Sequence, residues 1–221
     1  ALGYGISRYL AGRYFYKFLG EADFEFFKYF QMEKDKVFVD VGANDGISAL
    51  TFRVFNKKNQ ILSFEPDTNH NKSLERVKKK IKNFSYLNLG IGKSNEELIL
   101  YIPKCGIIYI GQLASLFKDE AKNNVSKIIS KKNILDEVIL IEKKISIVTL
   151  DEMNLYPGAI KIDIEGYEYE AIEGGQNTIK KYEPILMIEV NEKSFEEIKN
   201  LLKELNYSIF VFNKNSKKLN T

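Results

Sequence analysis

Cysteine and histidine are almost absent from the chain. Of its 221 residues, only Cys105 is a cysteine and only His70 is a histidine. A single cysteine excludes an internal disulfide and a CxxC metal site. It also fits a reducing compartment, so we expect a cytoplasmic protein. A single histidine leaves carboxylates as the other candidates for a general base.

Long apolar runs and an excess of one charge are also missing. No stretch approaches the roughly 18 apolar residues of a membrane span, so we expect no transmembrane segment. The first residues also lack the apolar stretch of a signal peptide. The 33 basic and 30 acidic residues give a net charge of +3, which makes no strong case for nucleic acid or a membrane. Length and composition, with 44% hydrophobic and 29% charged residues, fit one globular domain.

The first 35 residues are rich in tyrosine and phenylalanine. Their aromatic residues recur at roughly helical spacing, which predicts two short helices that break near Gly20. These helices either cap the core, roof a substrate cleft or form a contact between copies of the chain as a homo-oligomer. Tyr4, Tyr9 and Tyr14 could stack on a sugar face, although packing in the core or an interface is the plainer role.

From residue 37 onward, short apolar strands alternate with helices. The predicted strands are 37–41, 60–65, 84–91, 159–164, 185–190 and 207–213, and the predicted helices are 46–56, 68–81, 167–181 and 194–206. This alternation predicts βαβ units in a parallel sheet, with right-handed crossovers. We therefore expect an α/β, Rossmann-like fold with helices on both faces of its sheet.

The middle of the chain has a weaker pattern. Residues 96–102 are predicted as an added strand, and residues 138–149 as one long or two short strands. Between them, residues 103–135 form an insertion that is either functional or mobile at this length. We expect one domain over the whole chain, with its core at 36–213 and a frayed polar tail at 214–221.

Open parallel sheets bind ligands beyond the carboxyl ends of their strands, at the point where strand order reverses. The residues just after each predicted strand are therefore candidates for a binding site. Most are polar or glycine: Asp40, Gly42, Asn44, Asp45 and Gly46; Glu65 and Pro66; Asn88, Gly90 and Gly92; Asp163, Glu165 and Gly166; and Glu189 and Asn191. Together they predict one lined crevice.

The turn after the first strand reads VGANDG. A dinucleotide fingerprint, GxGxxG, needs a glycine where Asn44 stands and a third glycine further on. Asp45 would also place a negative charge where phosphates sit at a helix N-terminus. No GK[ST] follows, so the turn is not a P-loop. We expect a ligand without phosphates; the alternative for Gly42 and Gly46 is a tight turn with no ligand.

Glu65 lies about 20 residues past this turn, where an acid accepts hydrogen bonds from ribose hydroxyls. Taken alone it would be a solvated acid at the end of a strand. S-adenosylmethionine is a nucleoside with a sulfonium and an amino-acid tail, and it carries no phosphate. Such a cation suits an acidic crevice lined with glycine.

Five motifs follow one another over residues 37–213: VDVGANDG, FEPDTNHNKSL, TLDEM, IKIDIEGYEYEAIEGG and EPILMIEV. In this order they resemble the FkbM-type S-adenosylmethionine-dependent methyltransferase family. The resemblance implies a class I methyltransferase fold of about seven strands, the last antiparallel. It also implies methyl transfer mainly to oxygen, often on sugar hydroxyls of glycans or secondary metabolites. Only eight residues follow 207–213, which leaves little chain for the usual closing hairpin.

The resemblance implies cofactor contacts for nine residues. These are Asp40, Gly42, Asn44 and Gly46 under the methionine part, Glu65 and Pro66 at the ribose, Asn88 and Gly90 beside adenine, and Asp163 near the reacting centre. Ser115, in GQLASLF, resembles a residue of the family's substrate loop. Glu165 matches, with Asp163, the segment beside the reacting centre.

Methyl transfer from a sulfonium is an in-line displacement, for which an enzyme mainly supplies proximity and orientation. A general base assists an alcohol acceptor. His70 follows Glu65 on the cofactor side, so a structural or adenine-rim role is expected for it. Asp163 and Glu165 are the predicted catalytic carboxylates, and both face the cleft if the strand ends before them. Otherwise Asp163 contacts the cofactor or caps a loop, and Glu165 caps the helix that starts nearby.

The acceptor is expected to be a small molecule or a glycan, enclosed by the N-terminal segment and the insertion. Ser115, Glu189 and Asn191 are the candidate substrate contacts. Magnesium on Asp163, Glu189 and Asn191 is conceivable, since it favours hard oxygen ligands, but no metal site is predicted. The alternatives to an O-methyltransferase are a non-catalytic scaffold or binding protein with a degenerate crevice, and an NAD-dependent oxidoreductase.

Overall fold

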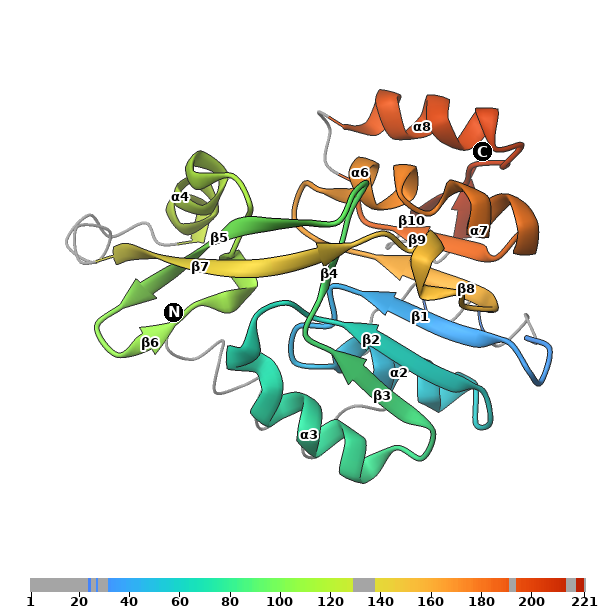
Figure 1. Cartoon of the computed structure of the whole chain (residues 1–221), viewed down its shortest axis with the longest axis horizontal. Helices are drawn as coiled ribbons and strands as arrows, with labels where there is room; N and C mark the ends of the chain where they lie inside the picture. Colours follow the sequence, from blue (N-terminus) through green and yellow to red (C-terminus); the bar gives the residue numbers. More distant parts are fainter. Residues whose placement is uncertain are drawn as a thin grey trace.

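A five-stranded parallel sheet forms the centre of the protein. In spatial order its strands are β3 (Phe84–Leu87), β2 (Gln60–Phe64), β1 (Val37–Val41), β8 (Pro157–Ile162) and β9 (Ile185–Ile188). Every neighbouring pair is parallel. The chain runs outward from β1 through β2 to β3 and then returns to the other side of β1, so strand order reverses between β1 and β8 (Figure 1).

The computed structural model describes Phe24, Phe27 and residues 32–128, 138–190, 194–213 and 218–220. The remaining residues of the predicted N-terminal helices lie outside this described part. The predicted contact between copies of the chain, and the three tyrosines proposed for sugar stacking, lie outside it as well.

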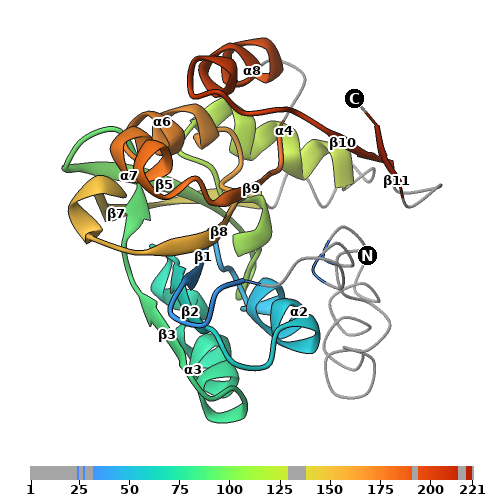
Figure 2. The same ribbon diagram turned by 90° about the vertical axis from the view of Figure 1, so that its right-hand side faces the viewer.

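Helices cover both faces of the sheet, as predicted. On one face lie α2 (Ile47–Phe55) and α3 (Asn71–Lys80), the latter preceded by the 3₁₀ turn η2 (Thr68–His70). On the other lie α6 (Glu168–Glu173), α7 (Gln176–Tyr182) and α8 (Phe195–Glu204), which Figure 2 shows above the sheet.

The single helix predicted at 167–181 is broken in the structure. Gly174 and Gly175 separate α6 from α7. A Cβ on Gly174 would lie 1.9 Å from the carbonyl oxygen of Gly92. The chain therefore packs here at a distance that only glycine permits, and the helical pattern of the flanking residues does not reveal it.

Alternate residues of β1 enter two separate cores. Val39 and Val41 pack toward α6, α7 and α8, whereas Phe38 packs toward α2. The Phe38 ring stacks on Phe52 of α2 with centroids 4.0 Å apart. Phe24 and Phe27 are buried in the same core as Phe38. These two residues therefore pack in the core, which was one of the three alternatives for the aromatic segment.

A second sheet of four strands lies beside the first. Its order is β4 (Gly90–Ile91), β7 (Val138–Val148), β5 (Glu96–Cys105) and β6 (Ile108–Tyr109). β5 and β7 pair antiparallel along their whole length, and β4 joins β7 in parallel. Figure 1 shows these long ribbons extending past the arrowheads of β1 and β2.

The expectation of about seven strands in one sheet is therefore wrong: in the described part of the chain the two main sheets have five and four strands, and a separate sheet has two. The predicted strand 84–91 splits, because β3 pairs with β2 while β4 turns to pair with β7. The strands predicted at 96–102 and 138–149 pair with each other rather than with the parallel sheet.

The insertion carries regular structure. It contains the end of β5, the strand β6, the 3₁₀ turn η3 (Gly111–Leu113) and the helix α4 (Lys118–Ile128). Backbone hydrogen bonds in both directions join Ser115 to Tyr101 of β5. The segment that leads into α4 is therefore attached to the second sheet. A further 3₁₀ turn, η4 (Asp151–Met153), precedes β8.

The predicted strand 207–213 does not join the parallel sheet. Within the described residues only β10 (Val211–Asn213) is a strand, and it pairs antiparallel with β11 (Lys218–Asn220) in a sheet of two. Tyr207 instead packs against the core and donates its hydroxyl to the Pro184 carbonyl oxygen at 2.8 Å. The tail predicted to fray is a strand at Lys218–Asn220.

Candidate active site

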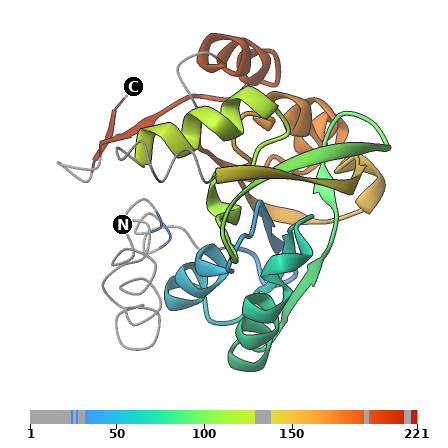
Figure 3. The ribbon, with the colours of Figure 1, turned by 90° about the vertical axis from the view of Figure 1, so that its left-hand side faces the viewer.

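A cavity of about 130 Å³ lies at the carboxyl ends of β1, β2 and β8. This is the point where strand order reverses and where open sheets bind ligands. One wall consists of the turns after these strands, and the other consists of the second sheet and η3. Figure 3 faces this end of the strands and shows β7 and α4 across it. The cavity thus lies where the sequence predicts the crevice.

The turn after β1 is built on left-handed backbone. Gly42, Asn44 and Gly46 have φ angles of 84°, 48° and 78°. A Cβ on Gly42 would lie 1.9 Å from the Asp163 carbonyl oxygen. Only glycine allows the two turns that follow β1 and β8 to approach this closely.

Glu65 is buried where β2 ends, with 7% of its surface exposed. Its Oε2 accepts the Asn44 backbone N–H at 2.7 Å, and its Oε1 accepts the Asp67 N–H at 2.8 Å. Burial raises the pKa of this carboxyl, although the charge of His70 and the two backbone donors oppose the rise. Glu65 is therefore not a solvated acid, because it ties together the turns after β1 and β2 at the cavity wall.

His70 lies in the same wall, among three carboxylates. Its Nδ1 is 3.1 Å from Asp45 Oδ1, and its Nε2 is 3.9 Å from Asp67 Oδ2. Burial opposes the charged ring, but the hydrogen bond to Asp45 and the charges of Glu65, Asp45 and Asp67 outweigh it and raise the pKa of His70. The ring lines the cavity on the same side as Glu65, and the adenine-rim role stays a prediction. Its carboxylate partners were not anticipated.

The opposite wall is apolar. Leu100 of β5 and Ile145 and Ile147 of β7 face the cavity from the second sheet. A Cβ on Gly90 would lie 2.5 Å from Ile147 Cδ1 and 3.7 Å from the Pro66 ring. Gly90 therefore leaves a narrow apolar slot between the two walls.

The nine predicted cofactor contacts divide into two groups. Six line the cavity: Gly42, Asn44, Glu65, Pro66, Gly90 and Asp163. Asp40, Gly46 and Asn88 lie behind its walls. The Asn88 amide exchanges hydrogen bonds with Asn71 and donates to the Glu65 carbonyl oxygen at 2.9 Å. A Cβ on Gly46 would meet Val77 at 2.8 Å.

Asp40 is fully buried beneath the cavity. Its Oδ2 accepts the Ser63 hydroxyl at 2.8 Å, and its Oδ1 has no hydrogen-bond partner among the described residues. Burial raises the pKa of Asp40, and the neighbouring Lys161 partly opposes this. The register places Ser63 and Lys161 on either side of Asp40, so a polar row crosses three central strands.

Asp163 and Glu165 both line the cavity, because β8 ends at Ile162. Lys161 Nζ contacts Asp163 Oδ2 at 2.8 Å, and the Lys161 side chain is only 7% exposed. One carboxylate oxygen of Asp163 is therefore engaged by a buried ammonium group, which sequence reasoning missed. The lysine stands between isoleucines in IKID, which is the signal that could have revealed it.

The buried Glu168 organises the turn after β8. Glu165 and Gly166 have φ angles of 55° and 104°. The buried Glu168 accepts the backbone N–H groups of Ile164 and Gly166 on its Oε1, at 3.1 and 3.0 Å. Burial raises the pKa of Glu168. Glu168 thus orders the turn before α6, which the sequence did not predict, and the helix-capping alternative for Glu165 stays a prediction.

Of the three predicted substrate residues, Ser115 alone lies at the cavity among those described. Its Oγ is 3.4 Å from Glu120 Oε2 and from the Glu165 carbonyl oxygen, and it accepts the Phe117 N–H at 3.1 Å. Glu189 is exposed at the end of β9 and does not line the cavity. Asn191 lies outside the described residues.

Neither a metal-binding cluster nor a membrane-spanning helix is found in the described part of the chain. No group of three or more His, Cys, Asp or Glu side chains there is arranged to hold a metal ion. No helix there is both long enough and apolar enough to span a bilayer.

Comparisons with known proteins identify a family and a similar fold. The family described as "Methyltransferase FkbM domain" matches residues 40–209. A crystal structure of methyltransferase FkbM from Methylobacillus flagellatus KT superposes with a TM-score of 0.55 at 16% identity, over 80% of this chain and 39% of that protein. This likeness shows the fold, and the chain spans well under half the length of that protein.

A crystal structure of precorrin-6y C5,15-methyltransferase from Geobacter metallireducens GS-15 also superposes, with a TM-score of 0.45 and 11% identity. It covers 89% of this chain and 80% of that protein. No match is found among curated proteins.

Proposed function

The chain belongs to the FkbM methyltransferase family, and we propose that it transfers the methyl group of S-adenosylmethionine to a hydroxyl oxygen of a sugar, a glycan or a secondary metabolite. The main support for this proposal is the acidic lining of the cavity. Its described lining holds four acids, Glu65, Asp67, Asp163 and Glu165, and no lysine or arginine. Behind this lining, Lys143 pairs with Asp67 at 2.9 Å and Lys161 pairs with Asp163 at 2.8 Å, so the acids remain in excess. Such a field attracts cations and repels phosphates. S-adenosylmethionine bears a sulfonium and an ammonium group and no phosphate.

The residues at the cavity fit the parts of this cofactor. Each Glu65 oxygen accepts one backbone N–H, and a carboxylate oxygen has a second acceptor site that a ribose hydroxyl can use. The apolar slot beside Gly90, between Pro66 and Ile147, suits a flat adenine ring. The glycine turn at Gly42 would hold the amino-acid tail, close to Asp163.

S-adenosylmethionine, when bound, supplies a methyl group on a positively charged sulfur that departs as a neutral thioether. The chain's own contribution is orientation, worth about 7–11 kcal/mol for well-aligned reactants. We assign proton removal to Glu165: its carboxylate takes the acceptor's hydroxyl proton as the new O–C bond forms, and later releases it to water. Asp163, held by Lys161, orients the reactants.

The two alternatives are less well supported. An NAD-dependent oxidoreductase would bring a pyrophosphate against Asp45 and the four lining carboxylates, without a GxGxxG turn to receive it. A non-catalytic binding protein would bind the same cofactor but would show no methyl transfer. Binding of S-adenosylmethionine without binding of NADH would exclude the oxidoreductase. Measured methyl transfer would exclude the non-catalytic binding protein.

Titration calorimetry with S-adenosylmethionine and its demethylated product tests the cofactor assignment. We expect micromolar binding, with an affinity at least tenfold lower for Glu65→Ala. The matched control is Glu97→Ala, an exposed acid on β5, which should bind like the wild type. A folded sample that binds NADH but not S-adenosylmethionine would contradict the proposal.

Transfer of a labelled methyl group to a panel of free sugars, glycans and amines tests the acceptor. We expect label on hydroxyl acceptors, as methyl ethers that survive mild alkali. Methyl esters would release the label under these conditions. Label on amines alone would contradict oxygen as the acceptor atom while leaving methyl transfer intact.

A further inference from the structure

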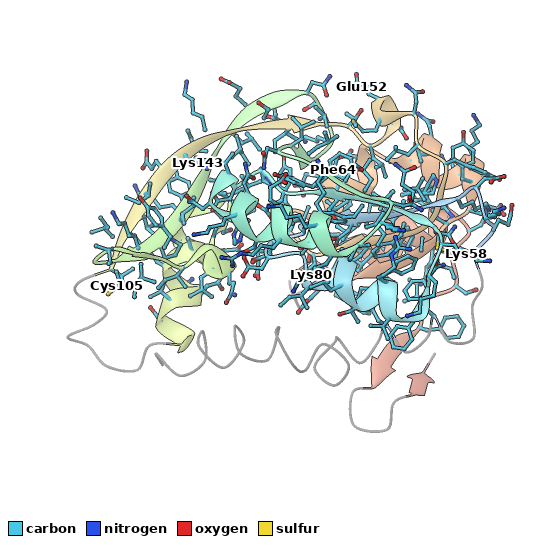
Figure 4. All side chains as sticks on the ribbon, turned by 90° about the horizontal axis from the view of Figure 1, so that it is seen from below. Lys58, Phe64, Lys80, Cys105, Lys143 and Glu152 are labelled. Carbon is cyan, nitrogen blue, oxygen red and sulfur yellow. The ribbon has the colours of Figure 1, made fainter. Side chains whose placement is uncertain are left out.

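The end of the second sheet carries exposed apolar side chains. Ile107, Ile108, Tyr109 and Ile139, which we term the apolar tip, are 92%, 54%, 45% and 56% exposed. They lie where β5 turns into β6 and where β7 begins. Figure 4 places Cys105, the last residue of β5, at one extreme of the long axis. The apolar tip is thus far from the core of the parallel sheet.

Strand register shows that both faces of this end carry apolar side chains. Lys104 on β5 lies between Ile139 on β7 and Tyr109 on β6. The next row places Cys105 between Val138 and Ile108. None of the four residues of the apolar tip joins a hydrophobic cluster of the described residues. Exposed apolar groups gathered in this way mark interaction sites.

Among the described residues, the charged side chains nearest the apolar tip are lysines; Asp136 and Glu137, which precede β7 in the sequence, lie outside the described part. Between Leu98 and Lys118 the only charged residues are the lysines Lys104 and Lys118, and residues 138–141 are uncharged. Lys104 Nζ lies 4.9 Å from the Tyr109 ring centroid, and Lys118 Nζ lies 5.5 Å from the Tyr101 centroid. Further from the end, Lys118 also pairs with Glu142 at 3.3 Å.

This combination fits the interface of a lipid bilayer. Isoleucines enter the acyl boundary, tyrosine lies at headgroup level, and lysine contacts anionic headgroups. We propose that the apolar tip inserts into the surface of a bilayer containing anionic lipids. The near balance of charge over the whole chain does not oppose this, because headgroup attraction acts within about 8–10 Å.

Sedimentation with vesicles tests the proposal on the full chain. We expect binding to vesicles of three parts phosphatidylcholine to one part phosphatidylglycerol. The double variant Ile107→Asn/Ile108→Asn should lower the partition coefficient at least tenfold. Phe210→Asn is the matched control, since Phe210 is 52% exposed elsewhere on the molecule. It should sediment like the wild type.

Lys104→Gln isolates the electrostatic contribution. It should weaken binding to the anionic vesicles about fivefold, the effect of one lysine near a charged surface. Binding to pure phosphatidylcholine should not change. Raising the salt concentration should remove the difference between the two proteins. This variant and the salt series keep the proposal testable if the double variant does not fold, as judged by circular dichroism.

Three outcomes would overturn the proposal. The wild type could fail to bind either vesicle, or the double variant could bind as well as the wild type. Ultracentrifugation could instead show self-association that the double variant abolishes, without vesicle binding, which would assign the apolar tip to a second copy of the chain. S-adenosylmethionine affinity, measured without vesicles, should be equal in all variants. A failure here is therefore distinct from a failure of the proposed function.

Discussion

The two sheets differ in what they bury. The parallel sheet buries a polar row at its centre, where Ser63, Asp40 and Lys161 lie side by side on β2, β1 and β8. The buried cluster of the second sheet is apolar throughout, with Ile102 and Ile145 at its middle. Its charged side chains lie outside this cluster, and one of them, Lys143 of β7, pairs with Asp67 in the cavity wall at 2.9 Å. The comparison teaches that the turns of the parallel sheet supply the carboxylates of the cavity, while the second sheet supplies the apolar side chains of the opposite wall.

The largest expected effect comes from replacing the assigned base. Glu165→Gln keeps the shape of the side chain but removes its ability to accept a proton. We expect kcat to fall about 10²–10⁴-fold, the usual range for a general base, with S-adenosylmethionine affinity little changed. Glu142→Gln, on the outer side of β7, should leave kcat unchanged. Equal turnover of Glu165→Gln and wild type would remove Glu165 from the mechanism.

Two glycines with positive φ sharpen the comparison. Gly42, beside the Asp163 carbonyl, has no room for a Cβ, whereas Gly106 in the second sheet has φ 57° and nothing within 4 Å. Alanine at either site costs about 1–2 kcal/mol of backbone strain. At Gly42 overpacking adds about 1–3 kcal/mol. Urea unfolding should show the larger loss for Gly42→Ala, and equal losses would mean that the β8 turn relaxes freely.

The same contrast holds for two ion pairs. Lys161→Met leaves Asp40 and Asp163 without their buried cation, which we expect to cost about 3 kcal/mol, the low end for a broken buried pair. The low end applies because the Asp163 side chain is 25% exposed. Lys118→Met removes an exposed pair on the second sheet and should cost about 0.5 kcal/mol or less. Urea midpoints measure both, and a similar cost would show that the polar row contributes no special stability.

The parallel sheet was predictable because its signals are local. Val37–Val41 and Gln60–Phe64 are short apolar runs that end at turns, and both strands were predicted to within a residue. The second sheet depends on pairing between β5 and β7, about 40 residues apart, which no local pattern specifies. Asn88 shows this limit for a single side chain. It lies just after a strand, as predicted, but its amide hydrogen-bonds to Asn71 and does not line the cavity.

His70 gives the most sensitive test of the cavity's charge. As the only histidine, it gives a single set of ring signals by NMR. Its pKa should lie above the usual 6.5, because Asp45, Glu65 and Asp67 outweigh burial. Asp45→Asn should lower it, whereas Glu142→Gln should not.

A raised pKa means that the protonated ring stabilises the fold. This stability is fully present below about pH 6.5 and is lost as pH rises through the folded value. Each unit of measured shift corresponds to about 1.4 kcal/mol. Urea unfolding of wild type and His70→Gln should therefore converge as pH rises through the folded pKa. A ring pKa at or below 6.5 would mean that water screens the carboxylates, and it would weaken the case for a cavity that selects a cation.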